Sequence, residues 1–199
     1  MSGFNYRILV VDNEAAVRDT AKAILATQGY EVITAVDGFD ALVQLRRSLP
    51  DLIISDLSMP NMSGFEFLSV VRKRFPHIPV IAISGAYNGG LGGLIADAFL
   101  FKGQYRPEEL FTKIRDMVEA GPIRPYVPSP DHTPIWVPVN EQGRYFVVTC
   151  PACLRSSSIE AKESVTELRE SECPFCGTVI RILSEKHVLK KPSRASQRG

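Results

Sequence analysis

The first 121 residues alternate between short apolar runs and segments in which apolar residues recur every three or four positions. The runs predict buried strands, and the recurring segments predict helices with one apolar face. Strands and helices that alternate at this spacing predict βαβ units and a parallel sheet. The predicted strands are Tyr6–Val11, Glu31–Val36, Leu52–Ser55, Val80–Ile83 and Ala98–Phe101. The expected fold class is therefore α/β, an open, doubly wound sheet of five parallel strands.

Local signals place the ends of the predicted helices. Gly29 ends the first helix, because glycine is the residue that most readily leaves a helical conformation. Ser63 and Glu66 have the spacing of a capping box, and Pro107 opens the last helix. These signals agree with the alternation of strands and helices.

Polar residues stand at the carboxyl ends of four predicted strands: Asp12, Asn13 and Glu14, then Asp56, Ser84 and Lys102. This edge of a parallel sheet is where ligands bind. Carboxylates with an amide suit Mg²⁺, and a carboxylate beside Mg²⁺ can accept a phosphoryl group. Lys102 and Ser84 could neutralise and contact that group. Taken alone, Asp56 could equally be a strand-end residue that caps the following turn; the whole set favours phosphoryl chemistry.

Four short motifs carry a family resemblance: Ile-Leu-Val-Val-Asp-Asn-Glu, Ile-Ile-Ser-Asp-Leu-Ser-Met-Pro, Ala-Ile-Ser-Gly-Ala and Phe-Leu-Phe-Lys. Through them, residues 5 to about 120 resemble the receiver domain of two-component response regulators. The resemblance implies a flavodoxin-like sheet in the order 2-1-3-4-5. It also implies a histidine kinase as partner, whose phosphohistidine gives its phosphoryl group to Asp56. The protein would be a signalling switch that assists its own phosphoryl transfer and dephosphorylation, not an ordinary enzyme.

The resemblance also assigns roles to individual residues. Asp12, Asn13, Asp56 and the backbone carbonyl of Ser58 would hold Mg²⁺. Ser84 would be drawn toward the phosphoryl oxygens, and Lys102 would pair with them. Phe99 would be the aromatic residue that swings inward behind Ser84.

The sequence departs from the family pattern at three places. Asn13 stands where the family usually has a second acidic residue, which should weaken Mg²⁺ binding unless Glu14 compensates. Gly103 follows Lys102 in place of the usual proline. The segment between Ser84 and Phe99 is short and rich in glycine, so we expect a short fourth helix and a different response of that face. The alternative is a receiver that no longer cycles phosphate and serves as an adaptor or scaffold.

Domain boundaries follow from composition. We expect a receiver over residues 1–121, a linker over 122–144, a second domain over 145–183 and a basic tail over 184–199. The linker is rich in proline, which favours extended, semi-rigid chain. Ile135 and Trp136 lie within it, and we expect them to pack on a neighbouring domain.

All four cysteines lie in the second domain, as two Cys-x-x-Cys pairs separated by 19 residues: Cys150, Cys153, Cys173 and Cys176. This spacing predicts a structural Zn²⁺ site closed by four thiolates, in a small β domain that resembles a zinc ribbon. A thiol redox function is the alternative, but it needs a βαβ context after the motif, which is not visible here. Structural disulfides are not expected in a cytoplasmic protein.

Charge bears on the output partner. The net charge of the chain is +1, whereas residues 145–183 carry one more acidic than basic residue. Because DNA binding depends on clustered Lys and Arg, the ribbon favours a protein partner over DNA. The tail is basic and predicted to be disordered. No apolar run is long enough to cross a bilayer and no signal peptide pattern is present, so we expect a cytoplasmic protein. The sequence does not determine the oligomeric state, and it is compatible with a homodimer.

Overall fold

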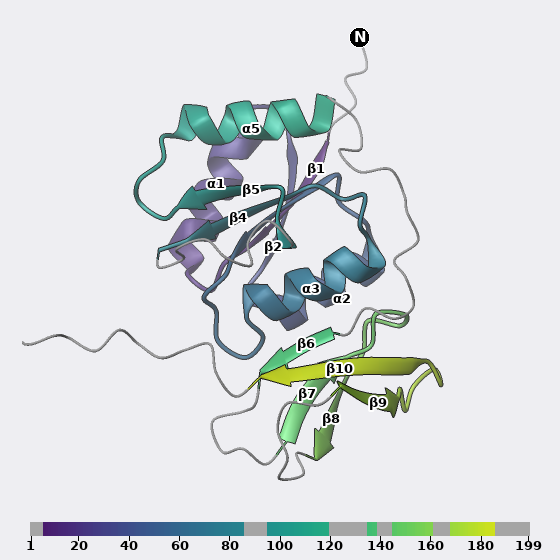
Figure 1. Ribbon diagram of the computed structural model, residues 1–199. Helices are drawn as coiled ribbons and strands as arrows, with labels where there is room; N and C mark the ends of the chain where they lie inside the picture. The colour runs from purple at the N-terminus through teal and green to yellow at the C-terminus, as the bar shows by residue number, and fades with distance from the viewer. Residues whose placement is uncertain (1–5, 86–94, 120–134, 139–144, 161–167, 186–199) are drawn as a thin grey trace, which may run out of the picture.

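The computed structural model describes residues 6–85, 95–119, 135–138, 145–160 and 168–185 (Figure 1). The N-terminal part contains a five-stranded parallel sheet in the order β2-β1-β3-β4-β5, which confirms the predicted fold class and strand order. The strands are β1 (Arg7–Val11), β2 (Glu31–Ala35), β3 (Leu52–Asp56), β4 (Val80–Ser84) and β5 (Ala98–Phe101). The helices are α1 (Ala15–Thr27), α2 (Gly38–Arg47), α3 (Gly64–Arg74) and α5 (Pro107–Glu119). Every predicted strand agrees with its observed bounds to within one residue.

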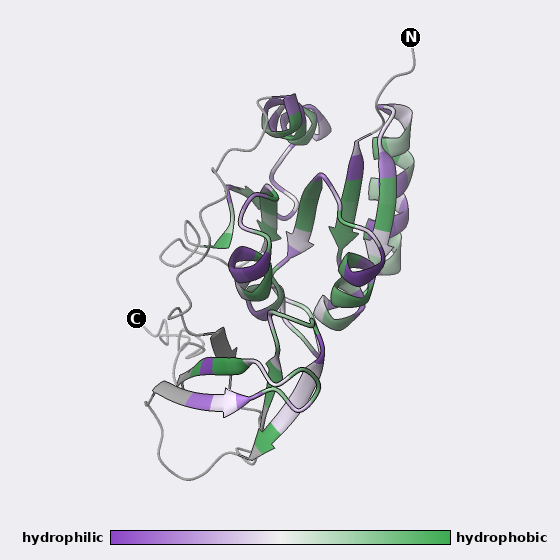
Figure 2. Ribbon diagram, turned by 90° about the vertical axis from the view of Figure 1, so that its right-hand side faces the viewer, coloured by the Kyte–Doolittle hydropathy of each residue, from purple (hydrophilic) through white to green (hydrophobic). Residues whose placement is uncertain are grey.

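Helices cover both faces of this sheet. Helices α1 and α5 lie on one face, and α2 and α3 lie on the other (Figure 1). Alternate residues of β1 divide between two buried clusters, Ile8 and Val10 with α1 and α5, Leu9 and Val11 with α2 and α3. Because both faces are buried, the strands are mainly apolar, whereas the helices alternate between apolar and polar positions (Figure 2).

The helix ends follow the local signals. Helix α1 ends at Thr27 and Gly29 has a φ of +85°, in the left-handed region that favours glycine. Ser63 and Glu66 form the predicted capping box at the start of α3. At the start of α2, the side chain of Asp37 accepts a hydrogen bond from the backbone N–H of Asp40 at 2.9 Å.

The C-terminal part consists of small β-sheets. Strands β7 (Tyr145–Thr149) and β8 (Ser156–Glu160) form one antiparallel hairpin, and β9 (Leu168–Glu172) and β10 (Val179–Glu185) form a second. Each hairpin carries one Cys-x-x-Cys pair between its strands. A further strand, β6 (Ile135–Pro138), pairs in parallel with β10.

Strand β6 corrects one detail of the predicted organisation, since it lies inside the segment predicted as linker. Residues 135–138 form a strand because they pair with β10, at the edge of a sheet with the order β6-β10-β9. A strand at the edge tolerates proline, because one row of its N–H groups has no partner strand. The rest of the predicted linker lies outside the described residues, as do the glycine-rich segment 86–94 and the tail from 186 onward.

The strands of the C-terminal part lie beside the face of the sheet that α2 and α3 cover (Figure 1), and β6 contacts α3. Within the described residues, no helix is both long enough and apolar enough to cross a membrane.

Candidate functional site

The carboxyl ends of β1 and β3 bring Asp12 and Asp56 together. The two strands are neighbours in the sheet, with Val11 opposite Ser55. Both carboxylates are buried, each with 4% of its surface exposed. Nζ of Lys102 lies 3.2 Å from Oδ2 of Asp12 and 3.0 Å from Oδ2 of Asp56. We call Asp12, Glu14, Asp56 and Lys102 the acidic site.

Lys102 places one positive charge among the three carboxylates of the acidic site. Its Nζ also donates a hydrogen bond to Oε1 of Glu14 at 2.8 Å. Burial opposes the charged form of Lys102, but the hydrogen bonds to Glu14 and Asp56 and the charge of Asp12 outweigh it, so its pKa is above the usual value. The ammonium group therefore stays charged at any ordinary pH and lies within reach of a group attached to Asp56.

The loop after β3 holds the Asp56 side chain. The backbone N–H of Ser58 donates to Oδ1 of Asp56 at 3.0 Å, which leaves Oδ2 to face Lys102. Helix α3 starts against this strand, because a Cβ atom on Gly64 would lie 2.0 Å from the backbone oxygen of Asp56. Only glycine permits this approach.

The other predicted site residues lie around this centre. Ser84 is buried at the end of β4, the strand next to β3. Phe99 is half-buried and packs against the core cluster that includes α2 and α3. Asn13 and Ser58 are exposed at the ends of their strands. The structure thus brings Asp12, Asp56 and Lys102 into direct contact, while the Mg²⁺ ligand set remains a prediction.

Two neighbours of the acidic site were not predicted. Nη1 of Arg18, in α1, donates to the backbone oxygen of Asp12 at 2.7 Å. Tyr105 is half-buried, and its pKa is raised by burial and then by the negative charge of Asp12, although Lys102 opposes this. Neither residue belongs to a motif. The one sequence signal is the position of Arg18 in the helix that follows the first strand, six residues after Asp12.

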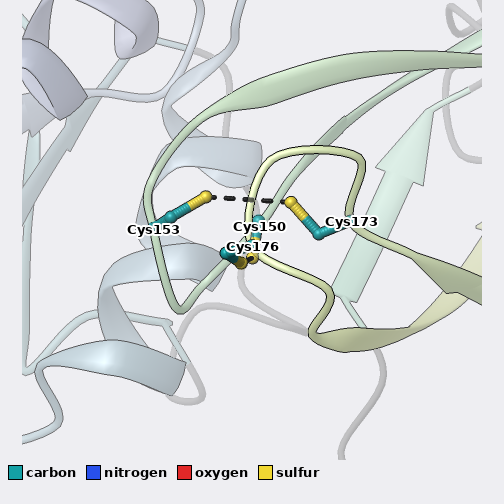
Figure 3. Close-up of side chains that lie close together, drawn as sticks. All are labelled: Cys150, Cys153, Cys173 and Cys176. Atoms are coloured by element: carbon teal, nitrogen blue, oxygen red, sulfur yellow. Dashed lines mark hydrogen bonds between the residues drawn. The ribbon is translucent and has the colours of Figure 1, made fainter.

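The four cysteines form a second candidate site. Their Sγ atoms all lie within 4.8 Å of one another, with Cys150 and Cys176 at 3.6 Å and Cys153 and Cys173 at 3.7 Å (Figure 3). A tetrahedral Zn²⁺ with Zn–S bonds of about 2.3 Å requires S···S separations of about 3.8 Å. A disulfide requires about 2.05 Å, and the cysteines are free. The donor set therefore fits a tetrahedral metal ion.

The two Cys-x-x-Cys pairs have the same backbone geometry. We call residues 150–155 the first knuckle and residues 173–178 the second knuckle. In the first, the N–H of Leu154 donates to the oxygen of Cys150 at 2.8 Å; in the second, Gly177 donates to Cys173 at 2.9 Å. Leu154 and Gly177 both have positive φ, +56° and +73°. Each knuckle thus turns through a left-handed residue directly after its second cysteine.

The thiols of the cluster differ in their acidity. Burial raises the pKa of Cys150 to about 12. The pKa of Cys176, which is exposed, is lowered to about 6 by hydrogen bonds from the hydroxyl and backbone N–H of Thr178. Because zinc binds thiolates, a metal ion must displace the proton of Cys150, while Cys176 offers a thiolate near neutral pH.

Comparison with known proteins assigns the N-terminal part of the chain to a family. The model of the response regulator receiver domain family matches residues 8–115, more than half of the chain. The chain belongs to this family. Receiver domains are signalling switches that bind Mg²⁺ and interact with histidine kinases.

Relatives and solved structures match over the same part. The chain is 32% identical over 129 residues to "Protein PilG" of Pseudomonas aeruginosa, covering 62% of this chain and 88% of PilG. It is 35% identical to the "Probable transcriptional regulator ycf27" of Porphyra purpurea, covering 56% of this chain and 47% of that protein. It is similar to the chemotaxis response regulator CheY4 of Vibrio cholerae, with a TM-score of 0.53, 30% identity and coverage of 57% and 99%. The response regulator TrrA of Thermotoga maritima, solved with Mg²⁺ and BeF, gives a TM-score of 0.53, 32% identity and coverage of 56% and 98%.

Proposed function

We propose that this protein is a response regulator that accepts a phosphoryl group on Asp56 and relays the change through a zinc-ribbon output domain. The observation that carries the proposal is the contact of Lys102 with the buried carboxylates of Asp12 and Asp56 at neighbouring strand ends. A receiver needs this arrangement, because a new phosphoryl group on Asp56 finds a fixed positive charge beside it.

In the proposed reaction, a carboxylate oxygen of Asp56 attacks the phosphorus of a kinase phosphohistidine. The new P–O bond forms as the P–N bond breaks, and the histidine leaves with the electron pair of that bond and takes up a proton. Mg²⁺ held by Asp12, Asn13, Asp56 and the Ser58 carbonyl would neutralise charge on the phosphoryl oxygens. Lys102 would move from the carboxylates to a phosphoryl oxygen, and the Ser84 hydroxyl would donate to another.

The proposed output domain is a ribbon closed by Zn²⁺ on Cys150, Cys153, Cys173 and Cys176. A protein partner suits it better than DNA, since its sequence has a slight acidic excess and four thiolates carry two more negative charges than the metal cancels. Binding of the full chain to duplex DNA that weakens steeply with salt would reverse this preference.

One observation supports a second candidate function, an adaptor that no longer cycles phosphate. Asn13 takes the place of the family's second acidic residue, so the acidic site has one carboxylate fewer for Mg²⁺. The adaptor would use the same surfaces with no phosphoryl group.

Intact mass after incubation with Mg²⁺ and a small-molecule phosphodonor distinguishes the two. The wild type should gain one phosphoryl mass, Asp56→Asn should gain none, and Asp19→Asn, on the exposed side of α1, should behave as the wild type. If neither the wild type nor the Asn13→Asp variant gained a phosphoryl group, the result would favour the adaptor.

A further inference from the structure

The ribbon shares its core with the receiver. A zinc ribbon has few apolar residues of its own, and here the buried ones continue into the cluster under α2 and α3. The ribbon members of this cluster are Val148, Cys150, Leu154, Cys173, Ile180 and Ile182. The contact lies on the α2–α3 face, opposite α1 and α5 (Figure 1).

The first knuckle faces α2 across a groove of about 310 Å³. Phe39, Leu42 and Val43 line it from α2, and Leu154 and Phe175 line it from the two knuckles. Leu154 is only 6% exposed and belongs to the buried cluster that also contains side chains of α2 and α3. Its burial therefore depends on the receiver.

The backbone of Leu154 supports this interpretation. Its φ of +56° lies in the region that favours glycine, and the second knuckle has Gly177 at the equivalent position. A leucine held in this conformation is strained, and such strain persists only where the surroundings compensate it. Here the compensation is the burial of the side chain beside α2.

Helix α2 is also tied to the loop that follows Asp56. Nδ2 of Asn61 donates to Oδ2 of Asp37 at 2.8 Å, and the N–H of Gly38 donates to the oxygen of Met62 at 3.1 Å. A Cβ atom on Gly38 would lie 2.6 Å from Cγ of Met62, so the loop and the helix start are closely packed. Helix α2 therefore contacts both the loop after Asp56 and the groove beside the first knuckle.

We propose that α2 is the docking surface for the first knuckle, with Leu154 as its anchor, and that zinc binding in the ribbon thereby stabilises α2. The docking stands on the contacts above. Its consequence for Asp56 rests on the proposed function: a phosphoryl mimic and zinc must change each other's affinity by the same factor, because such coupling is reciprocal.

Amide hydrogen exchange of the full chain, with zinc and after chelation, tests the docking. In the wild type, zinc should slow exchange over residues 38–47 severalfold and leave residues 15–27 of α1, on the opposite face, unchanged. In Leu154→Gly, zinc should still bind with a stoichiometry of one, because glycine adopts the left-handed turn without strain. The zinc-dependent protection of α2 should nevertheless be lost. Retained protection in Leu154→Gly would overturn the proposal.

Because Leu154→Gly changes the ribbon itself, a second variant changes only the receiver side of the groove. Val43→Arg adds a positive charge to a groove that Arg46 and Arg155 already line, without changing either knuckle. Zinc stoichiometry should therefore stay at one while α2 loses its zinc-dependent protection. Unchanged protection in this variant would also overturn the docking. Phosphoryl labelling is measured on the same samples as an independent readout. A wild type that gains no phosphoryl group but keeps the zinc-dependent protection of α2 would contradict the proposed function and leave the docking in place.

Discussion

Nζ of Lys102 lies 3.0 Å from Oδ2 of Asp56, although the two residues are 46 positions apart in the chain. The contact joins the ends of β3 and β5, which flank β4 in the sheet. The same ammonium group also contacts Asp12 and Glu14, so one cation holds three carboxylates. Any added cation must share these carboxylates with Lys102.

This sharing predicts the effect of Lys102→Gln on Mg²⁺ binding. Without the ammonium group, the buried carboxylates repel one another, and Mg²⁺ should relieve that repulsion more than it does in the wild type. The rise in melting temperature on adding Mg²⁺ should therefore be larger in Lys102→Gln. Lys22→Gln, exposed on α1, is the matched control. Equal Mg²⁺ shifts in all three proteins would mean that Lys102 and Mg²⁺ do not compete.

Asn13→Asp should strengthen Mg²⁺ binding. It restores one carboxylate to the acidic site, and we expect a gain of about tenfold in affinity, or about 1.4 kcal/mol. Isothermal titration calorimetry with Mg²⁺ measures this directly. Ala15→Asp adds the same charge at the exposed start of α1 and controls for a general field effect. An equal gain in both variants would exclude residue 13 from the ligand set.

Gly64→Ala should destabilise the receiver and distort the acidic site. The added Cβ would lie 2.0 Å from the oxygen of Asp56 and 2.7 Å from Cα of Leu57, so the backbone must move. Overpacking of this kind costs about 1–3 kcal/mol of unfolding free energy, measurable by urea denaturation. A Cβ atom added at Gly85 would lie 3.9 Å from its nearest neighbour, Cβ of Lys102, so Gly85→Ala should cost much less.

A buried ion pair joins α3 to the start of β5. Arg72 pairs with Asp97, with 9% and 6% of their side chains exposed, and also donates to the oxygens of Ile95 and Ile78. Arg72→Leu removes the guanidinium group that faces the buried carboxylate of Asp97 and should cost about 3–5 kcal/mol of unfolding free energy. Arg47→Leu, at the exposed end of α2, should change the urea midpoint little. Similar costs for the two variants would contradict the role of the pair.

Zinc affinity should rise with pH. Cys176 has a pKa of about 6, so its thiol is mostly protonated below pH 6 and zinc must then compete with a proton for it. Cys150 has a pKa of about 12, so zinc must displace its proton throughout the neutral range. Zinc binding at pH 7 should therefore release protons, which calorimetry in buffers of different ionisation enthalpy detects. Alkylation of the thiols should be slow with zinc and fast after chelation. Equal alkylation in both states would favour the thiol redox alternative.

The receiver was predictable because its signals are local and repeated. Strands buried on both faces are apolar throughout, and the polar residues that interrupt them mark the edge where the site forms. Asp12, Asp56 and Lys102 were named from this pattern, and the structure brings them together. The capping box of Ser63 and Glu66 depends on residues three apart, so the sequence alone determines it.

The C-terminal part was less predictable, because its geometry depends on tertiary contacts. Nothing local in the proline-rich segment distinguishes β6 from a linker, since pairing with β10 makes it a strand. Leu154 adopts a conformation that its own residue type disfavours, so only the packing beside α2 accounts for it. The contact of Arg18 with Asp12 likewise depends on how α1 lies after β1.

A crystal structure of the full chain with Mg²⁺ and beryllofluoride, a mimic of the phosphoryl group, would show directly whether Asp56 accepts a phosphoryl group. We expect beryllofluoride on Asp56, with Nζ of Lys102 moved away from Glu14 to contact a fluorine atom and the Ser84 hydroxyl turned toward another. Beryllofluoride absent from Asp56, with Lys102 still bound to all three carboxylates, would contradict it.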